Sequence, residues 1–431
     1  MKKIFRALVL MLALCLVFLS FASCSGKASE PVMSIDGKTL SLNTYEFLLS
    51  RMKGTLYYYG FDVTNDSFWK TIISTDGITY DDYFSTSVLE QASRYVIADY
   101  LFDENGLSFT EEDEENVDKL MNTLVEAAGS KTALNGELQA FGYNYGMLRE
   151  LYTLELKVKL LKAHLYGESG EKIETSVKEE YFNESYVAFG QIFLASYYYV
   201  IDTDSFGDNV YYTDEKHTAI AYDTVNGTPQ NDEFGKPMTD IFGNTAYFNG
   251  EGRVAYDKVN GVLGYLTDDD GNKVTENYDE ETLAEMFDRA HAYAEACNGD
   301  IDKFLEYASL YDESESGGSI TYLYCSPDYY GSQSASAAYL DDIAEGLTTM
   351  ETGECRAAQS DYGFHVFCRF ENEAGAYDDE AYADSFSDFY GNLINKLFDE
   401  ECAKHEDLVV IDHDNLEAAP TMAEVGVNIL Y

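Results

Sequence analysis

Residues 42–184 carry apolar side chains at the spacing of α-helices, and this pattern stops at one compact apolar run, residues 187–195. Such a change indicates a transition from helices to a buried strand. The strongest helical stretch spans residues 145–164, with one face formed by Met147, Leu151, Leu154, Val158 and Leu161. Residues 32–40 alternate around Asp36-Gly37 and predict a hairpin that leads into a helix from Leu42. Residues 32–184 are therefore expected to form a mainly helical domain.

The chain beyond the apolar run divides into three further parts. Residues 196–279 are rich in Tyr, Asp, Asn and Gly and predict a β-rich insertion. We expect no internal repeat anywhere in the chain. Helices are predicted at 281–297, around Phe304 and near 336–347, and a hairpin is predicted from Glu354 to Phe370. We expect 185–195 and 280–372 to form one domain that carries the insertion. Residues 373–431 are expected to form a C-terminal helix, near 379–405, and a tail.

The charge of the chain excludes one large class of partner. The 431 residues include 78 Asp and Glu against 28 Lys and Arg, which gives a formal charge of −50. A nucleic-acid binder gains affinity from a basic face, so we expect no nucleic-acid partner. Because 45% of the residues are hydrophobic, the acidity indicates a solvated exterior around a packed core and not disorder.

The N-terminus has the parts of an export signal. Basic residues precede an apolar run from Ala7 to Phe21, and small residues follow. Phe21-Ala22-Ser23-Cys24 resembles a bacterial lipobox, with Phe21 where leucine is usual. We expect a lipoprotein signal peptide over 1–23, lipidation of Cys24, a tether over 24–31, and an anchor on the extracytoplasmic face of the cell membrane. The alternative is ordinary secretion, with Cys24 as a bystander.

Five cysteines follow Cys24, and none is spaced as a CxxC pair, so no metal site is expected. Cys355 and Cys368 lie symmetrically about the predicted turn of the 354–370 hairpin. They are expected to face each other, where they can oxidise if the separation of their Cα atoms permits a disulfide.

Three stretches resemble, in order, the PrsA/SurA group of extracytoplasmic foldases, in which a helical chaperone domain accompanies a parvulin-type (PpiC) peptidyl-prolyl cis-trans isomerase domain. Residues 32–49, "VMSIDGKTLSLNTYEFLL", look like the strand, turn and helix that open such proteins. Residues 304–318, "FLEYASLYDESESGG", resemble a parvulin helix, loop and paired glycines. The most specific stretch is 350–370, "METGECRAAQSDYGFHVFCRF", which has Gly353, Glu354, Gly363 and His365 in place. The match covers most of the chain outside the insertion.

The resemblance implies an α+β fold: a helical chaperone domain like the N-terminal domain of SurA, and a parvulin-like α/β domain with a four-stranded antiparallel sheet and helices. It implies two core histidines, a nearby Asp or Cys, an apolar proline pocket and no cofactor. His365 matches one histidine, whereas the other falls on Gln191, and Asp312 or Ser314 are the candidates in the shortened acidic loop. The catalytic candidates are therefore His365 and Gln191. The substrate-binding candidates are Ile320, Tyr322, Tyr339 and Ile343.

Two functions remain open from the sequence. The first is a membrane-anchored foldase that binds unfolded exported proteins and isomerises X-Pro bonds. The second is a non-catalytic chaperone or binding lipoprotein with a degenerate parvulin domain, which Gln191 favours because an amide cannot change charge as histidine can. A third, weaker alternative is that the insertion binds a surface ligand or metal ions.

Overall fold

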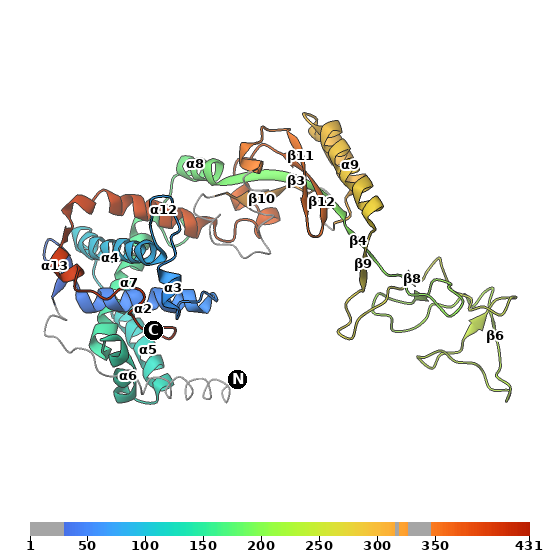
Figure 1. Ribbon diagram of the computed structural model, residues 1–431, viewed down its shortest axis with the longest axis horizontal. Helices are drawn as coiled ribbons and strands as arrows, with labels where there is room; N and C mark the ends of the chain where they lie inside the picture. The colour runs from blue at the N-terminus through green and yellow to red at the C-terminus, as the bar shows by residue number, and fades with distance from the viewer. Residues whose placement is uncertain (1–29, 315–318, 326–345) are drawn as a thin grey trace. The chain divides into compact units, whose positions relative to one another are not determined.

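The computed structural model describes residues 30–314, 319–325 and 346–431, which divide into two compact units of helices and sheet (Figure 1). The helical unit comprises the described residues up to Lys178 together with Asp388–Tyr431, and the sheet unit comprises Glu179–Ser387. The α+β class predicted from the sequence is confirmed.

The helical unit begins with the predicted hairpin. Strands β1 (Pro31–Ile35) and β2 (Lys38–Ser41) are joined at Asp36 and Gly37, which both have positive φ, as a two-residue hairpin turn requires. The hydroxyl of Ser41 then accepts the backbone N–H of Thr44 and caps the following helix. This confirms the predicted hairpin and the predicted helix from Leu42.

Capping side chains fix where the helices of the helical unit begin, and the core of the unit forms between these helices. Thr110 and Asp113 cap the start of α5 reciprocally: the Thr110 side chain accepts the backbone N–H of Asp113, and the Asp113 side chain accepts that of Thr110. The predicted helix at 145–164 is confirmed as α7, capped by Asn144. The helices of this part are α2 (Leu42–Tyr58), α3 (Asp66–Trp69), α4 (Tyr80–Glu104), α5 (Glu111–Ala128), α6 (Lys131–Leu138), α7 (Tyr145–Tyr166) and α8 (Thr175–Ser185), which continues into the sheet unit.

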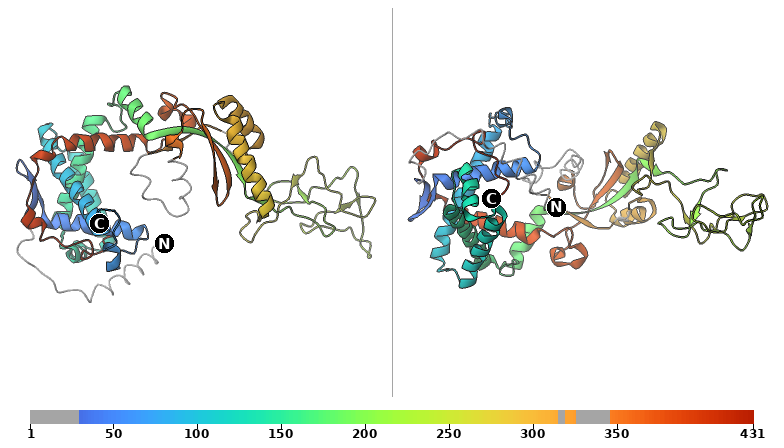
Figure 2. Two further views of the ribbon diagram at one scale, coloured as in Figure 1. Left: turned by 45° about the horizontal axis from the view of Figure 1, so that its top comes forward. Right: turned by 90° about the horizontal axis from the view of Figure 1, so that it is seen from below.

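The C-terminal segment belongs to the helical unit. Helix α12 (Phe389–Ala403) packs against α4 and α7, as both views in Figure 2 show, and β13 (Val410–Ile411) pairs with β1. Helix α13 (His413–Leu416) follows. The last helix was predicted from residue 379, but Asp379 caps only a short 3₁₀ turn (Glu380–Tyr382), so α12 begins ten residues later.

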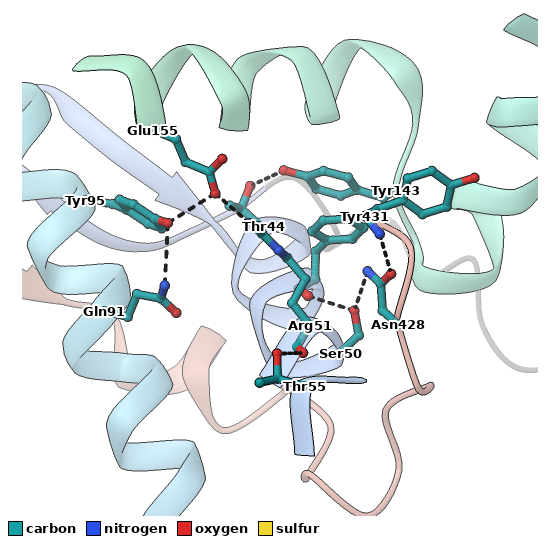
Figure 3. Close-up of polar contacts among 11 residues, drawn as sticks. Thr44, Ser50, Arg51, Thr55, Gln91, Tyr95, Tyr143, Glu155, Asn428 and Tyr431 are labelled. Atoms are coloured by element: carbon teal, nitrogen blue, oxygen red, sulfur yellow. Dashed lines mark hydrogen bonds and ion pairs between the residues drawn. The ribbon is translucent and has the colours of Figure 1, made fainter. Parts of the chain in front are cut away.

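The end of the chain lies against α2. Asn428 donates from its backbone N–H to the carbonyl of Ser50. Its side-chain amide donates to the Ser50 hydroxyl (Figure 3). Nearby, buried Lys53 donates to the carbonyls of Ala423 and Val425. Figure 3 also shows Arg51 of α2 paired with Glu155 of α7 at 2.6 Å. Polar contacts thus fix both α7 and the tail to α2.

The sheet unit contains the predicted four-stranded antiparallel sheet, in the order β10-β3-β12-β11. Its strands are β3 (Tyr186–Ala195), β10 (Thr321–Tyr324), β11 (Cys355–Ser360) and β12 (Gly363–Arg369). Helix α9 (Glu280–Cys297) packs on the sheet against β11 and β12 (Figure 1). Helix α10 (Ile301–Tyr311) packs against β3. The hairpin predicted at 354–370 is confirmed. The helix predicted near 336–347 falls mostly outside the described residues.

The insertion is built from three two-stranded ribbons. Strands β4 (Tyr197–Tyr199) and β9 (Thr275–Asn277) form the first. The second joins β5 (Tyr211–Tyr212) to β8 (Val262–Leu263), and the third joins β6 (Thr228–Pro229) to β7 (Tyr247–Phe248).

The expectation of no internal repeat was wrong. Ala-Tyr-Asp-Thr-Val-Asn-Gly at 221–227 recurs as Ala-Tyr-Asp-Lys-Val-Asn-Gly at 255–261. The two copies pair reciprocally, because Asp223 N donates to the carbonyl of Ala255 and Asp257 N donates to that of Ala221. The repeat was missed because its matching blocks are short and the segments between them differ in length.

Candidate functional site

The sheet brings His365 and Gln191 to one face. His365 on β12 lies opposite Phe193 on β3, and Gln191 lies opposite Phe367. Because side chains alternate along a strand, these four residues share a face, with His365 and Gln191 as diagonal neighbours. We call this the His365 face.

The ring of His365 is buried and lies between aromatic neighbours. Its centroid is 5.0 Å from that of Phe193 and 5.6 Å from that of Phe367, and its Nε2 is 2.8 Å from the Ser360 hydroxyl. Burial lowers the pKa of His365 to about 4, so the ring is neutral at neutral pH. A neutral imidazole can donate from one nitrogen and accept at the other. Sequence reasoning missed Ser360, whose only signal was its place at the predicted turn.

We expect acid to destabilise the sheet unit through His365. The unfolded histidine has a pKa near 6.5, so the unfolded chain binds more protons between about pH 6.5 and 4. The stabilisation is present above this window and is lost as the pH falls through it, by up to about 3 kcal/mol. Urea unfolding at pH 7 and 4.5 should show a smaller loss in His365→Gln than in the wild type. An equal loss in both, with exposed His413→Gln as the control, would contradict this assignment.

Gln191 and the acidic loop border the same face. Gln191 is half-buried, and its amide can donate and accept hydrogen bonds. Asp312 accepts the backbone N–H of Phe193 at 2.6 Å, and the Ser314 hydroxyl donates to Asp312 at 2.5 Å. Asp312 therefore pairs with the backbone of β3 at Phe193, the residue opposite His365.

The structure does not bring Tyr322 to the His365 face. Tyr322 lies opposite Ala188 on β3 and so points to the other side of the sheet, where its ring contacts Phe182, Tyr382 and Phe386. The expected pocket role of Tyr322 beside His365 is therefore corrected, because the register of β10 reverses its side. Ile320 lies just before β10 and is partly exposed. Tyr339, Ile343 and Cys24 lie outside the described residues.

A different apolar set lies on the His365 side of the sheet. Leu323, which precedes Tyr324 on β10, pairs with Val187 and faces the same side as Gln191. A buried cluster joins it to two residues that sequence reasoning missed, Leu347 and Met350. The only sequence signal for them was that Met350 opens the stretch with the most specific motif. The members of the cluster are Val187, Phe189, Leu323, Cys325, Leu347, Met350, Ala358 and Phe367.

The helical unit has a second candidate site around the connection from α2 to α4. Tyr58 and Tyr59, at the end of α2, are 81% and 73% exposed. Ring contacts between Phe61, Phe68 and Tyr80 hold the connection in place. We define the aromatic surface as the exposed side chains of this region: Tyr57, Tyr58, Tyr59, Phe61, Ile72, Ile73, Ile78 and Tyr83.

A cavity of about 620 Å³ lies against the connection from α2 to α4 and the start of α4. Trp69, Lys70 and Thr79 line it, and they flank the exposed isoleucines of the connection. Leu416 and Pro420 of the C-terminal segment complete the wall. The cavity thus depends on the return of the chain end to this unit.

Cys355 and Cys368 are cross-strand partners, which confirms that they face each other. The neighbouring Arg369 N–H donates to the carbonyl of Glu354, so the cysteines occupy a non-hydrogen-bonded position, where Cα atoms are about 4.5 Å apart. Both are buried thiols in the structure. The contact with Cys368 and burial raise the pKa of Cys355.

We expect these thiols to form a disulfide with oxidised glutathione. The two thiols lose two hydrogens, and one glutathione disulfide becomes two glutathione thiols. Closing this short loop should stabilise the sheet unit by about 3 kcal/mol, seen as a higher urea midpoint with loss of two hydrogens by mass. Cys355→Ser should abolish the gain, whereas Cys402→Ser, in the helical unit, should keep it. A gain that survives Cys355→Ser would contradict the pairing.

Two searches of the described residues concern membranes and metals. No helix within residues 30–314, 319–325 and 346–431 is long and apolar enough to cross a bilayer. In the same ranges, no group of three or more His, Cys, Asp or Glu is placed to hold a metal ion.

The units and the His365 face define an α+β chain in which a helical unit accompanies a four-stranded antiparallel sheet unit. No family model matches this chain, and no curated protein matches it significantly. Among solved structures, it is similar to PrsA from Bacillus subtilis, with 13% identity, 82% of this chain and 94% of that chain covered, and a TM-score of 0.18. It is also similar to a peptidylprolyl isomerase (PrsA) from Bacillus anthracis, with 10% identity, 74% and 95% covered, and a TM-score of 0.20.

Proposed function

We propose that this chain is a foldase of parvulin type whose helical unit binds unfolded polypeptides through the aromatic surface. The exposure of that surface carries the proposal. Large apolar side chains gathered on one exposed region mark an interaction site, and an unfolded chain offers apolar side chains in no fixed arrangement. Rings presented on a folded support suit such a partner because they bury much area at little conformational cost.

The sheet unit supplies the isomerase part of the proposal. Rotation about an X-Pro bond faces a barrier of about 20 kcal/mol, and a site lowers it by favouring the twisted amide with preorganised polar groups beside an apolar pocket. The His365 face carries the polar groups His365, Ser360 and Gln191 next to the apolar cluster. The substrate class is therefore proline-containing unfolded polypeptide.

The place of action is part of the same proposal. The export signal and Cys24 support a foldase that is lipid-anchored on the extracytoplasmic face of the cell membrane and acts on exported proteins. Labelling with radioactive palmitate in a bacterial host should mark the wild type and not Cys24→Ala. Equal labelling of both would refute the anchor.

Aggregation of an unfolded client tests the polypeptide-binding part. At several-fold excess, the protein should suppress aggregation, and Tyr58→Ser/Tyr59→Ser should suppress it far less because both rings are exposed and outside the core. Leu120→Ser changes an exposed apolar residue on α5 and serves as the control. No suppression by the wild type would refute this part.

The isomerase part is tested by a protease-coupled assay on a proline peptide. His365→Ala and Ser360→Ala should each lower the catalysed rate at least tenfold if the His365 face holds the twisted amide. The second candidate function, a non-catalytic chaperone, is favoured by the uncharged Gln191 and by the neutral, buried His365. A wild-type rate equal to buffer, with aggregation still suppressed, would establish that alternative.

A further inference from the structure

The insertion contains three turns of the form Asp-x-Phe-Gly. They occupy residues 204–207, 232–235 and 240–243. In each turn the Asp carboxylate accepts the backbone N–H of the Phe at 2.9 Å, and the Gly N–H donates to the Asp carbonyl. The Asp and the Gly therefore set the turn, and the Phe contributes only its backbone to it.

Two further turns show that the phenylalanine is not needed for this geometry. At 249–252 and 268–271 the same hydrogen bonds form with Glu251 and Asp270 in the position of the Phe. An acidic residue at this position is thus compatible with the turn, and an exposed carboxylate interacts with water more favourably than an exposed phenylalanine ring does. The geometry of the turn therefore does not require Phe at this position.

The three phenylalanines are exposed. Phe206, Phe234 and Phe242 are 61%, 85% and 41% exposed. Phe206 contacts Arg253 at 5.7 Å, and Phe242 contacts the edge of Tyr212 at 6.4 Å, so these two rings have a fixed support. The duplicated turns at 221–227 and 255–261 likewise expose Val225 and Val259, each at 89%. One exposed apolar residue is ordinary, but its recurrence at equivalent turn positions indicates a contact surface.

The charge around these turns selects the partner. Residues 196–279 contain sixteen Asp and Glu against five Lys and Arg. Hydrogen bonds from Asn226 and Asn260 hold the pKa values of Asp223 and Asp257 below their ordinary range, so both stay charged in mild acid. An acidic field of this kind attracts cationic segments and repels acidic ones.

We propose that the insertion is a second polypeptide-binding surface, on which Phe206, Phe234 and Phe242 contact unfolded segments that carry Lys or Arg beside large apolar residues. This inference rests on the proposed function, because it assumes that the chain binds unfolded polypeptides. It adds a second site and a preference in the charge of the client. The aromatic surface consists of other residues, all in the helical unit, so the two surfaces can be varied independently.

Fluorescence anisotropy with two unstructured peptides tests the proposal. Both peptides have the same Phe and Leu positions, and the other positions are Lys in one and Glu in the other. The Lys peptide should bind the protein at least tenfold more tightly than the Glu peptide. Its affinity should fall several-fold when salt rises from 50 to 500 mM, because salt screens exposed charges.

The variant Phe206→Ser/Phe234→Ser/Phe242→Ser should weaken binding of the Lys peptide at least tenfold. Glu251→Ser/Asp270→Ser, at the same position of the two acidic turns, is the matched control and should change it less than threefold. Phe234→Ser alone, at the most exposed of the three rings, should weaken binding measurably even if the triple variant misfolds. Unchanged affinity in Phe234→Ser and the triple variant, or equal affinity for both peptides, would overturn the inference.

Failure of this inference can be told apart from failure of the proposed function. In one outcome, the wild type suppresses aggregation, Tyr58→Ser/Tyr59→Ser does not, and the phenylalanine variants bind the Lys peptide as tightly as the wild type. This outcome refutes only the second surface. If the wild type binds neither peptide and suppresses no aggregation, both proposals fall together.

Discussion

Gly54→Ala is expected to destabilise the helical unit by about 3 kcal/mol or more. A Cβ at Gly54 would lie 1.8 Å from the carbonyl oxygen of Asn428, a backbone atom that cannot turn aside as a flexible side chain can. The tail would have to leave α2, which breaks the contacts of Asn428 with Ser50 and disturbs those of Lys53. Urea unfolding of the variant should show a lower midpoint.

Gly136→Ala is the matched control for this prediction. Gly136 also lies in a helix, α6, but a Cβ there would meet no atom within 4 Å. Replacing an exposed helical glycine by alanine should stabilise the unit by about 0.5–1 kcal/mol. Equal effects at Gly54 and Gly136 would show that the tail does not lie against α2 as described.

Gly363→Ala is expected to destabilise the sheet unit by about 3 kcal/mol. Gly363 begins β12 at a φ of 153°, and a Cβ there would lie 2.1 Å from the carbonyl oxygen of Leu194. The β12 strand would separate from β3 at the end that holds His365 and Ser360. Unfolding followed by urea should show the loss, and any isomerase activity should fall with it.

Gly250→Ala provides the comparison within the same unit. A Cβ at Gly250 would meet open space, and we expect a change of less than about 0.5 kcal/mol. If Gly363→Ala changed the free energy of unfolding as little as Gly250→Ala does, β12 would not approach β3 at Gly363 as closely as described.

Local patterns predicted most of the elements. The β1–β2 hairpin follows from Asp36-Gly37, and the β11–β12 hairpin follows from two apolar runs around a turn, so neither needs distant contacts. The return of the C-terminal segment to the helical unit could not be predicted. It depends on Lys53 and Ser50 meeting residues more than 350 positions away in the chain.

The candidate site was only partly predictable for a related reason. His365 and Gln191 share a face because β12 and β3 align Phe193 with His365, and no local pattern determines that register. If the pairing of β12 with β3 were shifted by one residue, His365 and Gln191 would lie on opposite faces of the sheet. The same argument explains Tyr322, which was assigned to a pocket although the register of β10 directs it away.

Binding of a permanently unfolded protein tests the central claim most directly. Reduced, carboxymethylated α-lactalbumin, labelled with a fluorophore, should bind the protein, while native α-lactalbumin should not. Tyr58→Ser/Tyr59→Ser should weaken the binding by about tenfold, since about 1.4 kcal/mol of contact is lost with the two exposed rings. Leu120→Ser should leave it unchanged. Equal binding of native and unfolded protein, or an affinity unaffected by loss of Tyr58 and Tyr59, would contradict a foldase that holds unfolded chains on its aromatic surface.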